Sequence, residues 1–296
     1  MKIDGVFSGG GVKAYAFLGV LEVLKSKELK LERVAGTSAG AIVASFLASG
    51  FDVDDIRLKL DELDLKMFLD PPLITKWLPF SKWVFLYFQL GINKGDKLEN
   101  WLYSQLAEKN IYTFNDLPRG YLKVVVSDLS LGKLVVIPDD LERVYGINPL
   151  HFPVAKAVRM SAGFPYFFMP KKLPGKSNTK SIIVDGGLLS NFPLWIFDNQ
   201  KGKQDRPILG VKLSETVENT DPRRIRNALD MFQALFATMK MAHDTRYIST
   251  AQKRNIIFVP VEGIGAINLS INEATKENLI NIGIESAEVF LQKWPK

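Results

Sequence analysis

One segment, Gly36 to Gly40, constrains the fold of this chain more than any other. Its sequence is G-T-S-A-G, and it lies between a short apolar run and a helix-forming run rich in alanine. The pattern G-x-S-x-G in that position predicts a strand, a sharp turn and a helix, with Ser38 in a strained backbone conformation. The helix would point its N-terminal amides and the positive end of its dipole toward the exposed hydroxyl. Such a site suits a nucleophile that attacks an acyl carbon, although the same pattern also occurs in turns without a catalytic role.

The composition is that of a globular protein. The chain has 296 residues, of which 47% are hydrophobic and 24% are charged, enough for one large α/β domain or for a domain with an extension. It has no cysteine, which excludes disulfides and a thiolate nucleophile and fits a cytoplasmic protein. The N-terminus has no secretory pattern, and no run reaches the roughly 18 apolar residues that span a bilayer. We therefore expect a soluble, cytoplasmic protein that touches membranes only from one side.

The charge balance is mildly basic. There are 38 basic and 32 acidic residues, giving a formal net charge of +6. A basic excess can attract nucleic acid or anionic lipid. The sequence shows neither a zinc-finger spacing nor a strong helix-turn-helix pattern, so we do not expect a nucleic-acid partner.

Strands alternate with helices along the chain. This alternation predicts the α/β class, with a mainly parallel central sheet covered on both faces in a three-layer α/β/α arrangement. The predicted strands are Ile3–Phe7, a second strand that closes with Gly36 to Ser38, Leu122–Val126, Lys133–Ile137, Ser181–Val184, Pro207–Leu213 and Ile256–Pro260. The predicted helices are Ala14–Lys27, Ala39–Ser49, a helix capped by Asp52 and Asp55, Val154–Met160, Arg223–Arg246 and a last helix capped by Ser270 and Glu273.

The first strand is followed by a glycine-rich loop that fits two functions. Gly9, Gly11 and Ala14 satisfy the dinucleotide pattern G-x-G-x-x-G/A. A nucleotide site of that kind also needs an acidic residue at the end of the second strand, where this chain has Gly36 to Ser38 instead. Successive glycines leave backbone amides uncovered and let an anionic oxygen approach. The loop therefore favours an oxyanion hole over a pyrophosphate site.

A serine nucleophile needs a base, and the two histidines are poor candidates. Neither His151 nor His243 lies in a recognisable catalytic pattern, and His243 falls inside a predicted helix. Asp185 is better placed, because it ends an apolar strand and is followed by two glycines, where a parallel sheet exposes functional groups. A free aspartate is a weak base, so this role requires burial beside Ser38. The alternative is that Asp185 only caps a Gly-Gly turn.

Four motifs in this order resemble those of the patatin-like phospholipases. The resemblance covers about residues 4–198, and one departure is Ala14, where many members have glycine. The motifs are Ser8 to Lys13 as a glycine-rich oxyanion motif with its basic residue, Gly36 to Gly40 as a nucleophile elbow, Ser161 with Pro165 as a Ser-x-x-x-Pro element, and Asp185-Gly186-Gly187 continuing to Asn191 and Pro193 as a catalytic-aspartate motif.

The resemblance implies a patatin-like fold and a serine acyl-ester hydrolase of the phospholipase A or lysophospholipase type, without metal or cofactor. Ser38 and Asp185 would form a dyad without histidine, acting on phospholipid or another lipid ester. The oxyanion hole would be formed by Gly9, Gly10, Gly11 and Ala39, and the supporting residues would be Lys13, Gly36, Gly40, Gly186 and Gly187. Two alternatives stay open: a lipid-binding or regulatory protein of the same fold without turnover, and a nucleotide-binding protein that uses the glycine loop.

Two regions have no place in these motifs. Residues 4–198 would be the catalytic domain, and residues 199–296 an α/β extension packed on it. The stretch Leu73 to Leu90 is the most aromatic of the chain and has Lys76 and Lys82 among its apolar residues. It fits a core element or the wall of an acyl pocket, and also a cap that contacts a lipid surface, since tryptophan, phenylalanine and lysine together suit the headgroup boundary.

Overall fold

The computed structural model describes residues 1–62, 68–72, 86–175, 179–198, 206–214, 225–227, 230–232, 234–239, 252–261 and 271–294. Its centre is an eight-stranded sheet with the order β10-β9-β1-β2-β4-β8-β7, and β5 also pairs with β4. The main-sheet strands are β1 (Lys2–Phe7), β2 (Lys30–Thr37), β4 (Leu122–Asp128), β5 (Lys133–Ile137), β7 (Lys171–Pro174), β8 (Lys180–Asp185), β9 (Ile208–Ser214) and β10 (Ile256–Pro260). A two-stranded sheet pairs β3 (Gly91–Asn93) with β6 (Tyr166–Phe168).

The predicted α/β class with a mainly parallel sheet is confirmed. Strands β10, β9, β1, β2 and β4 are parallel neighbours, as expected where helices connect the strands. Strands β5 and β8 run antiparallel to β4, and β7 runs antiparallel to β8. The prediction that Asp185 ends a parallel strand is therefore wrong, because β8 returns through a hairpin from β7 and runs against β4.

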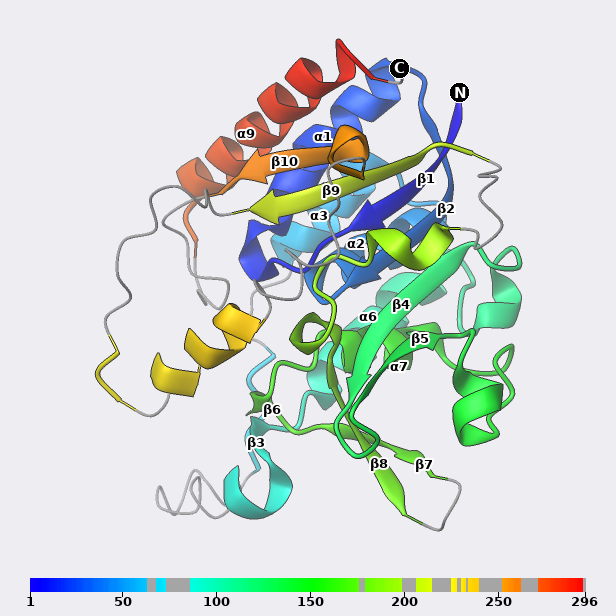
Figure 1. The fold of residues 1–296 in the computed structure, drawn as a ribbon, viewed down its shortest axis with the longest axis vertical. Coiled ribbons are helices and arrows are strands. Elements are labelled where there is room, and N and C mark those ends of the chain that lie inside the picture. Colours follow the sequence, from blue (N-terminus) through cyan, green and yellow to red (C-terminus); the bar gives the residue numbers. More distant parts are fainter. Residues whose placement is uncertain are drawn as a thin grey trace.

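Side chains alternate between two faces of the sheet and give each face its own core. One face carries Phe7, Val34 and Val124, and the other carries Val6, Ala35 and Val125. The first face is covered by helices, whereas residues 192–197, which include a 3₁₀ helix, pack on the second (Figure 1). In the part of the chain that the structure describes, the second layer is thus much thinner than the first. The α-helices are α1 (Tyr15–Ser26), α2 (Ala39–Ala48), α3 (Val53–Glu62), α6 (Asp96–Ala107), α7 (Val154–Ser161) and α9 (Glu273–Leu291).

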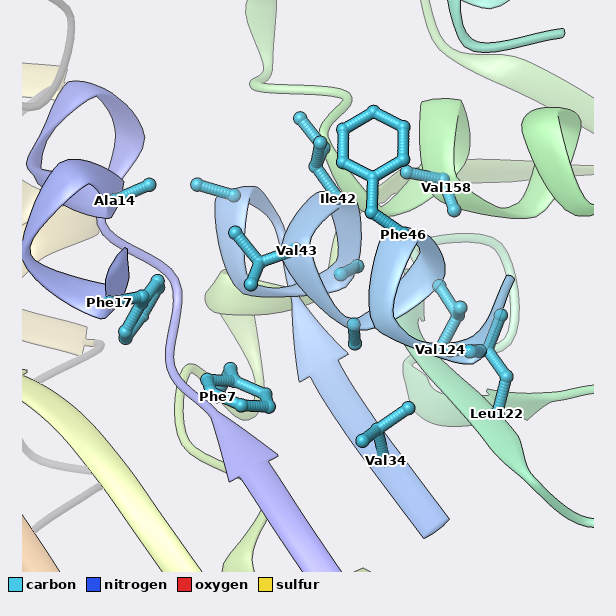
Figure 2. Packing of buried hydrophobic residues seen from close by; sticks show 14 of the residues in the cluster. Phe7, Ala14, Phe17, Val34, Ile42, Val43, Phe46, Leu122, Val124 and Val158 are labelled. Carbon is cyan, nitrogen blue, oxygen red and sulfur yellow. The ribbon is translucent and has the colours of Figure 1, made fainter. Parts of the chain in front are cut away.

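Helix α2 is held in the middle of the helical layer. Nine of its ten residues are buried, which fits its almost wholly apolar sequence, AGAIVASFLA. Figure 2 shows it above β1 and β2, with Phe46 turned toward Val158 of α7 and Val43 near Phe17 of α1. The Phe7 and Phe17 rings meet edge to face, with their centroids 5.4 Å apart. Because α2 is fixed on several sides, the turn that precedes it is fixed as well.

The C-terminal part of the chain extends the same sheet. Strand β9 pairs with β1, and β10 pairs with β9. Helix α9 packs along α1, where Gly19 and Gly283 allow close approach: a Cβ on either glycine would collide with the backbone of the opposite helix (Figure 1). The expected cap at Ser270 is wrong, because Asn272 caps α9 by accepting a hydrogen bond from the Thr275 amide at 2.9 Å.

Several other predicted elements can be compared with the structure, some of them only over part of their length. Asp52 and Asp55 cap α3 reciprocally, as predicted. Most of the aromatic stretch, residues 73–85, lies outside the described residues, and residues 86–89 are helical. Of the long helix predicted from residue 223 to 246, residues 230–232 and 234–239 are described and are helical. Among the described residues, no helix is both long and apolar enough to cross a bilayer.

Candidate active site

Ser38 occupies the sharp turn between β2 and α2. Its backbone has φ 55° and ψ −123°, a strained conformation for a residue with a side chain. A Cβ on Gly36 would collide with the backbone of Gly40, and a Cβ on Gly40 would collide with the backbone of Phe7. The two glycines of G-x-S-x-G are therefore required by close backbone contacts. This geometry agrees with the elbow expected from the sequence.

A buried serine, Ser161, fixes this turn through hydrogen bonds. The Ser38 amide donates a hydrogen bond to Ser161 Oγ at 2.9 Å, and the Ser161 hydroxyl donates to the Val125 carbonyl at 2.6 Å. Ser161 is fully buried at the C-terminal end of α7. It therefore connects the strained turn to the neighbouring strand β4.

The Asp185 carboxylate lies directly beside the Ser38 hydroxyl. Ser38 Oγ and Asp185 Oδ2 are 2.8 Å apart, and the Gly187 amide donates to Asp185 Oδ1 at 2.7 Å. Asp185 is only 2% exposed. Buried carboxylates that accept a hydrogen bond from a backbone amide are fixed in orientation, so Oδ2 stays directed at the serine.

The strand register explains how Asp185 reaches Ser38 from an antiparallel strand. Thr37 at the end of β2 pairs with Val125, and Asp185 at the end of β8 pairs with Val126. Because β4 continues beyond the end of β2, it brings the ends of β2 and β8 to the same level. A Cβ on Gly186 would collide with the Val125 carbonyl, so this glycine allows the chain to turn immediately after the aspartate.

The glycine loop borders Ser38 on the other side. Gly10, Gly11 and Ala39 line the cavity that contains the Ser38 hydroxyl, and Gly11 has a φ of 58°, which favours glycine. The expectation that Gly9 donates to an oxyanion requires correction, because its amide donates to the Asn191 carbonyl at 3.0 Å. Gly9 instead provides room, since a Cβ there would press on the Asn191 side chain and lie close to Ser38.

Two further residues of the motifs lie in or behind this loop. Asn191 lines the cavity, is 2% exposed, and its buried Oδ1 atom has no hydrogen-bond partner among the described residues. Lys13 is buried in the short 3₁₀ helix Gly11–Ala14 and is not part of the cavity wall. Lys13 therefore lies behind the cavity wall, next to residues that line it.

The cavity beside the dyad is lined mainly by apolar side chains. Its volume is about 160 Å³, and Ser38 and Asp185 lie in its wall. Apolar side chains from five segments of the chain line it: Ile42, Leu60, Leu98, Phe164, Phe167, Phe168 and Phe236. The Tyr15 hydroxyl also faces this region but donates to Leu60 O at 2.8 Å; burial, followed by the nearby Asp61 carboxylate, raises the pKa of Tyr15 above its usual value. Such a wall fits a hydrocarbon chain.

A buried arginine that sequence reasoning did not identify supports this wall. Arg159 is fully buried in α7, and burial lowers the pKa of its guanidinium to about 10. Its guanidinium donates to the carbonyls of Lys94, Gly95 and Met169 at 2.9–3.1 Å and lies over the Phe168 ring. The sequence does not reveal these three contacts, because all three acceptors are backbone carbonyls of segments distant from Arg159 or outside its helix.

The histidines contribute nothing to the described site. His151 is exposed at the surface, and His243 lies outside the described residues. The described site therefore consists of a strained serine, a buried aspartate, a glycine-rich loop and an apolar cavity. This combination defines an α/β protein with a serine–aspartate pair at a strand–helix elbow.

Comparisons with known proteins agree with this class. The chain belongs to the patatin-like phospholipase family, whose pattern it matches over residues 5–198. It is 46% identical over 294 residues to an uncharacterized protein, YqhO, of Bacillus subtilis, and covers 99% of both chains. It is 26% identical over 188 residues to an uncharacterized NTE family protein of Mycobacterium tuberculosis, covering 64% of this chain and 27% of that protein. The crystal structure of VipD from Legionella pneumophila shares the fold, with a TM-score of 0.58, 20% identity, and coverage of 98% of this chain and 67% of that one.

Proposed function

We propose that this protein is a serine hydrolase of lipid acyl esters, of the phospholipase A or lysophospholipase type. The observation that carries the proposal is the 2.8 Å contact between Ser38 Oγ and Asp185 Oδ2 at the wall of an apolar cavity. Membership of the patatin-like phospholipase family supports a lipid as substrate. The protein would work in the cytoplasm and meet membranes only at their surface.

The proposed reaction has two steps. Ser38 Oγ attacks the ester carbonyl carbon while Asp185 Oδ2 accepts the serine proton, and that proton then leaves with the alcohol product. In the second step, water gives a proton to Asp185 and attacks the acyl–serine ester. Asp185 returns this proton to Ser38 Oγ as the bond between Oγ and the acyl carbon breaks, which releases the fatty acid and restores the serine. The acyl chain would occupy the apolar cavity during both steps.

The developing oxyanion would be stabilised by backbone amides. The amides of Gly10, Gly11 and Ala39 are the proposed donors, because these residues line the cavity beside Ser38. The N-terminal end of α2 adds a favourable dipole at the same place. Loss of one oxyanion donor typically costs about 2.7–4 kcal/mol of transition-state stabilisation.

Substitution of the two proposed catalytic residues tests this function. Ser38→Ala, Asp185→Asn and the double variant are assayed with p-nitrophenyl butyrate and with a micellar lysophospholipid. Each single variant is expected to lose about 10³-fold or more in turnover, and the double variant to lose scarcely more, since the two residues act as one unit. His151→Ala, at an exposed position, is the control and is expected to keep wild-type turnover.

The assay also separates the alternatives. A lipid-binding or regulatory protein of this fold would bind lipid but show no turnover in the wild type. A nucleotide-binding protein would be stabilised against heat by nucleotides. Full activity of Asp185→Asn in a folded protein would contradict the proposed dyad.

A further inference from the structure

One helix of the C-terminal part has two apolar faces with different surroundings. Residues 230–232 and 234–239 are helical, and Phe236 of this helix is 7% exposed and lines the cavity beside Ser38. Its ring packs on Phe164 with a centroid distance of 4.9 Å. On an adjacent face of the helix, Met231, Leu235 and Met239 are 52%, 56% and 48% exposed. The helix therefore closes part of the cavity and presents large apolar side chains outward.

Other exposed apolar residues adjoin this helix. Tyr166 packs its ring against Phe232 at 4.6 Å and is itself exposed. Tyr166 pairs with Gly91 across the small β3–β6 sheet, and Gly91 follows the short helical segment that carries the exposed Tyr87 and Phe88. Figure 1 shows both helical segments in the same lower-left part of the molecule, one toward β6 and the other beyond β3. We call these residues the apolar rim: Tyr87, Phe88, Tyr166, Met231, Leu235 and Met239.

The sequence of this helix is unusual for a solvent-exposed one. Residues 231–239 read MFQALFATM and contain no charged residue. Asp230, which precedes them, pairs with Arg226 at 3.6 Å, and Lys240 follows them. A helix on a water-facing surface ordinarily carries charged residues on its outer face. Large apolar side chains gathered on one face of a helix are typical of helices that lie in the interface of a lipid layer.

From these observations we propose that the apolar rim docks on a lipid surface and passes a lipid from that surface to the cavity behind Phe236. This inference rests on the proposed lipid-ester hydrolysis and assigns a role to part of the C-terminal region. A lipid layer is favoured as the partner because the helix that carries much of the rim also lines the candidate active site. Lipid chains could therefore move from the layer to Ser38 without crossing water, which would oppose their transfer.

Vesicle binding tests the proposal. Flotation with phosphatidylcholine vesicles, with and without phosphatidylglycerol, is measured on the Ser38→Ala background so that no substrate is consumed. Leu235→Ser with Met239→Ser is expected to lower the bound fraction by about tenfold or more, because two large apolar side chains no longer enter the lipid. The matched control, Leu150→Ser with Val289→Ser, replaces two exposed apolar residues elsewhere and is expected to bind like the parent.

Turnover and oligomeric state complete the test. With Ser38 intact, the rim variant is expected to keep turnover of a short soluble ester and its melting temperature, while losing turnover of vesicle lipid. Unchanged vesicle binding by the rim variant would overturn the docking proposal. So would a wild-type dimer that the rim substitutions convert to a monomer, because the rim would then be the contact between two copies. Absence of soluble-ester turnover in the wild type would instead contradict the proposed function, whatever the binding result.

Discussion

At the scale of single residues, the site depends on contacts that hold a strained serine. Ser38 keeps its unfavourable φ because its amide donates a hydrogen bond to Ser161. The backbones at Gly36 and Gly40 are also packed so closely that a side chain at either position would collide with other backbone atoms. The elbow is predicted from a local pattern, whereas the pairing of Ser38 with Asp185 is predicted from the resemblance to the patatin-like phospholipases. The sequence does not predict that Ser161 joins Ser38 to Val125, since this bridge connects three segments far apart in the chain.

Replacement of Ser161 by alanine tests this bridge. The variant leaves the Ser38 amide and the Val125 carbonyl without their partner, which is expected to lower the free energy of unfolding by about 1–3 kcal/mol. Because Ser161 acts by positioning, kcat is expected to fall while KM changes little. Ser104→Ala is the control, since Ser104 is exposed and bonds only within its own helix. Chemical denaturation and ester kinetics give both quantities; equal effects of the two substitutions would contradict the positioning role.

At the scale of elements, the packing of helices and strands depends on strand direction and on how closely two backbones can approach each other. Periodicity predicts most strands of the main sheet, but it does not show that β8 runs antiparallel, because direction is set by the β7–β8 hairpin and not by the pattern within the strand. The amphipathic helix α6 is likewise absent from the sequence-based prediction. The contact of α1 with α9 also depends on an arrangement that local sequence does not reveal, since it requires Gly19 and Gly283 to face each other's helix.

Gly283→Ala is a direct test of that helix contact. Alanine favours an isolated helix over glycine by about 1 kcal/mol, but here its methyl group would collide with the Ala16 carbonyl. We therefore expect a net loss of stability, measured as a lower midpoint of urea unfolding. Asn281→Ala, at an exposed position of the same helix, is expected to leave the midpoint unchanged or to raise it slightly. A stabilised Gly283→Ala variant would show that α9 does not pack this closely.

At the scale of the whole molecule, the N-terminal and C-terminal parts share one sheet. We propose that residues 199–296 form an extension that cannot be separated from the catalytic part, because β9 covers the edge of β1 and α9 covers buried residues of α1. The family match ends at residue 198, so the sequence alone divides the chain at a place where the structure keeps the sheet continuous.

Truncation after residue 198 tests this proposal. The shortened chain would expose the edge of β1 and the apolar face of α1, and such surfaces favour aggregation. We expect it to aggregate or to lack a cooperative unfolding transition, whereas the full chain is expected to unfold in a single calorimetric transition. A folded and active fragment of residues 1–198 would contradict the proposal.

The central claim is that Ser38 is an activated nucleophile, and covalent labelling tests it most directly. The protein is treated with a fluorophosphonate, and the modified peptide is identified by mass spectrometry. We predict one adduct, on Ser38, which is lost in Ser38→Ala and forms much more slowly in Asp185→Asn. A folded wild-type protein that gives no adduct, or an adduct on another serine, would contradict it.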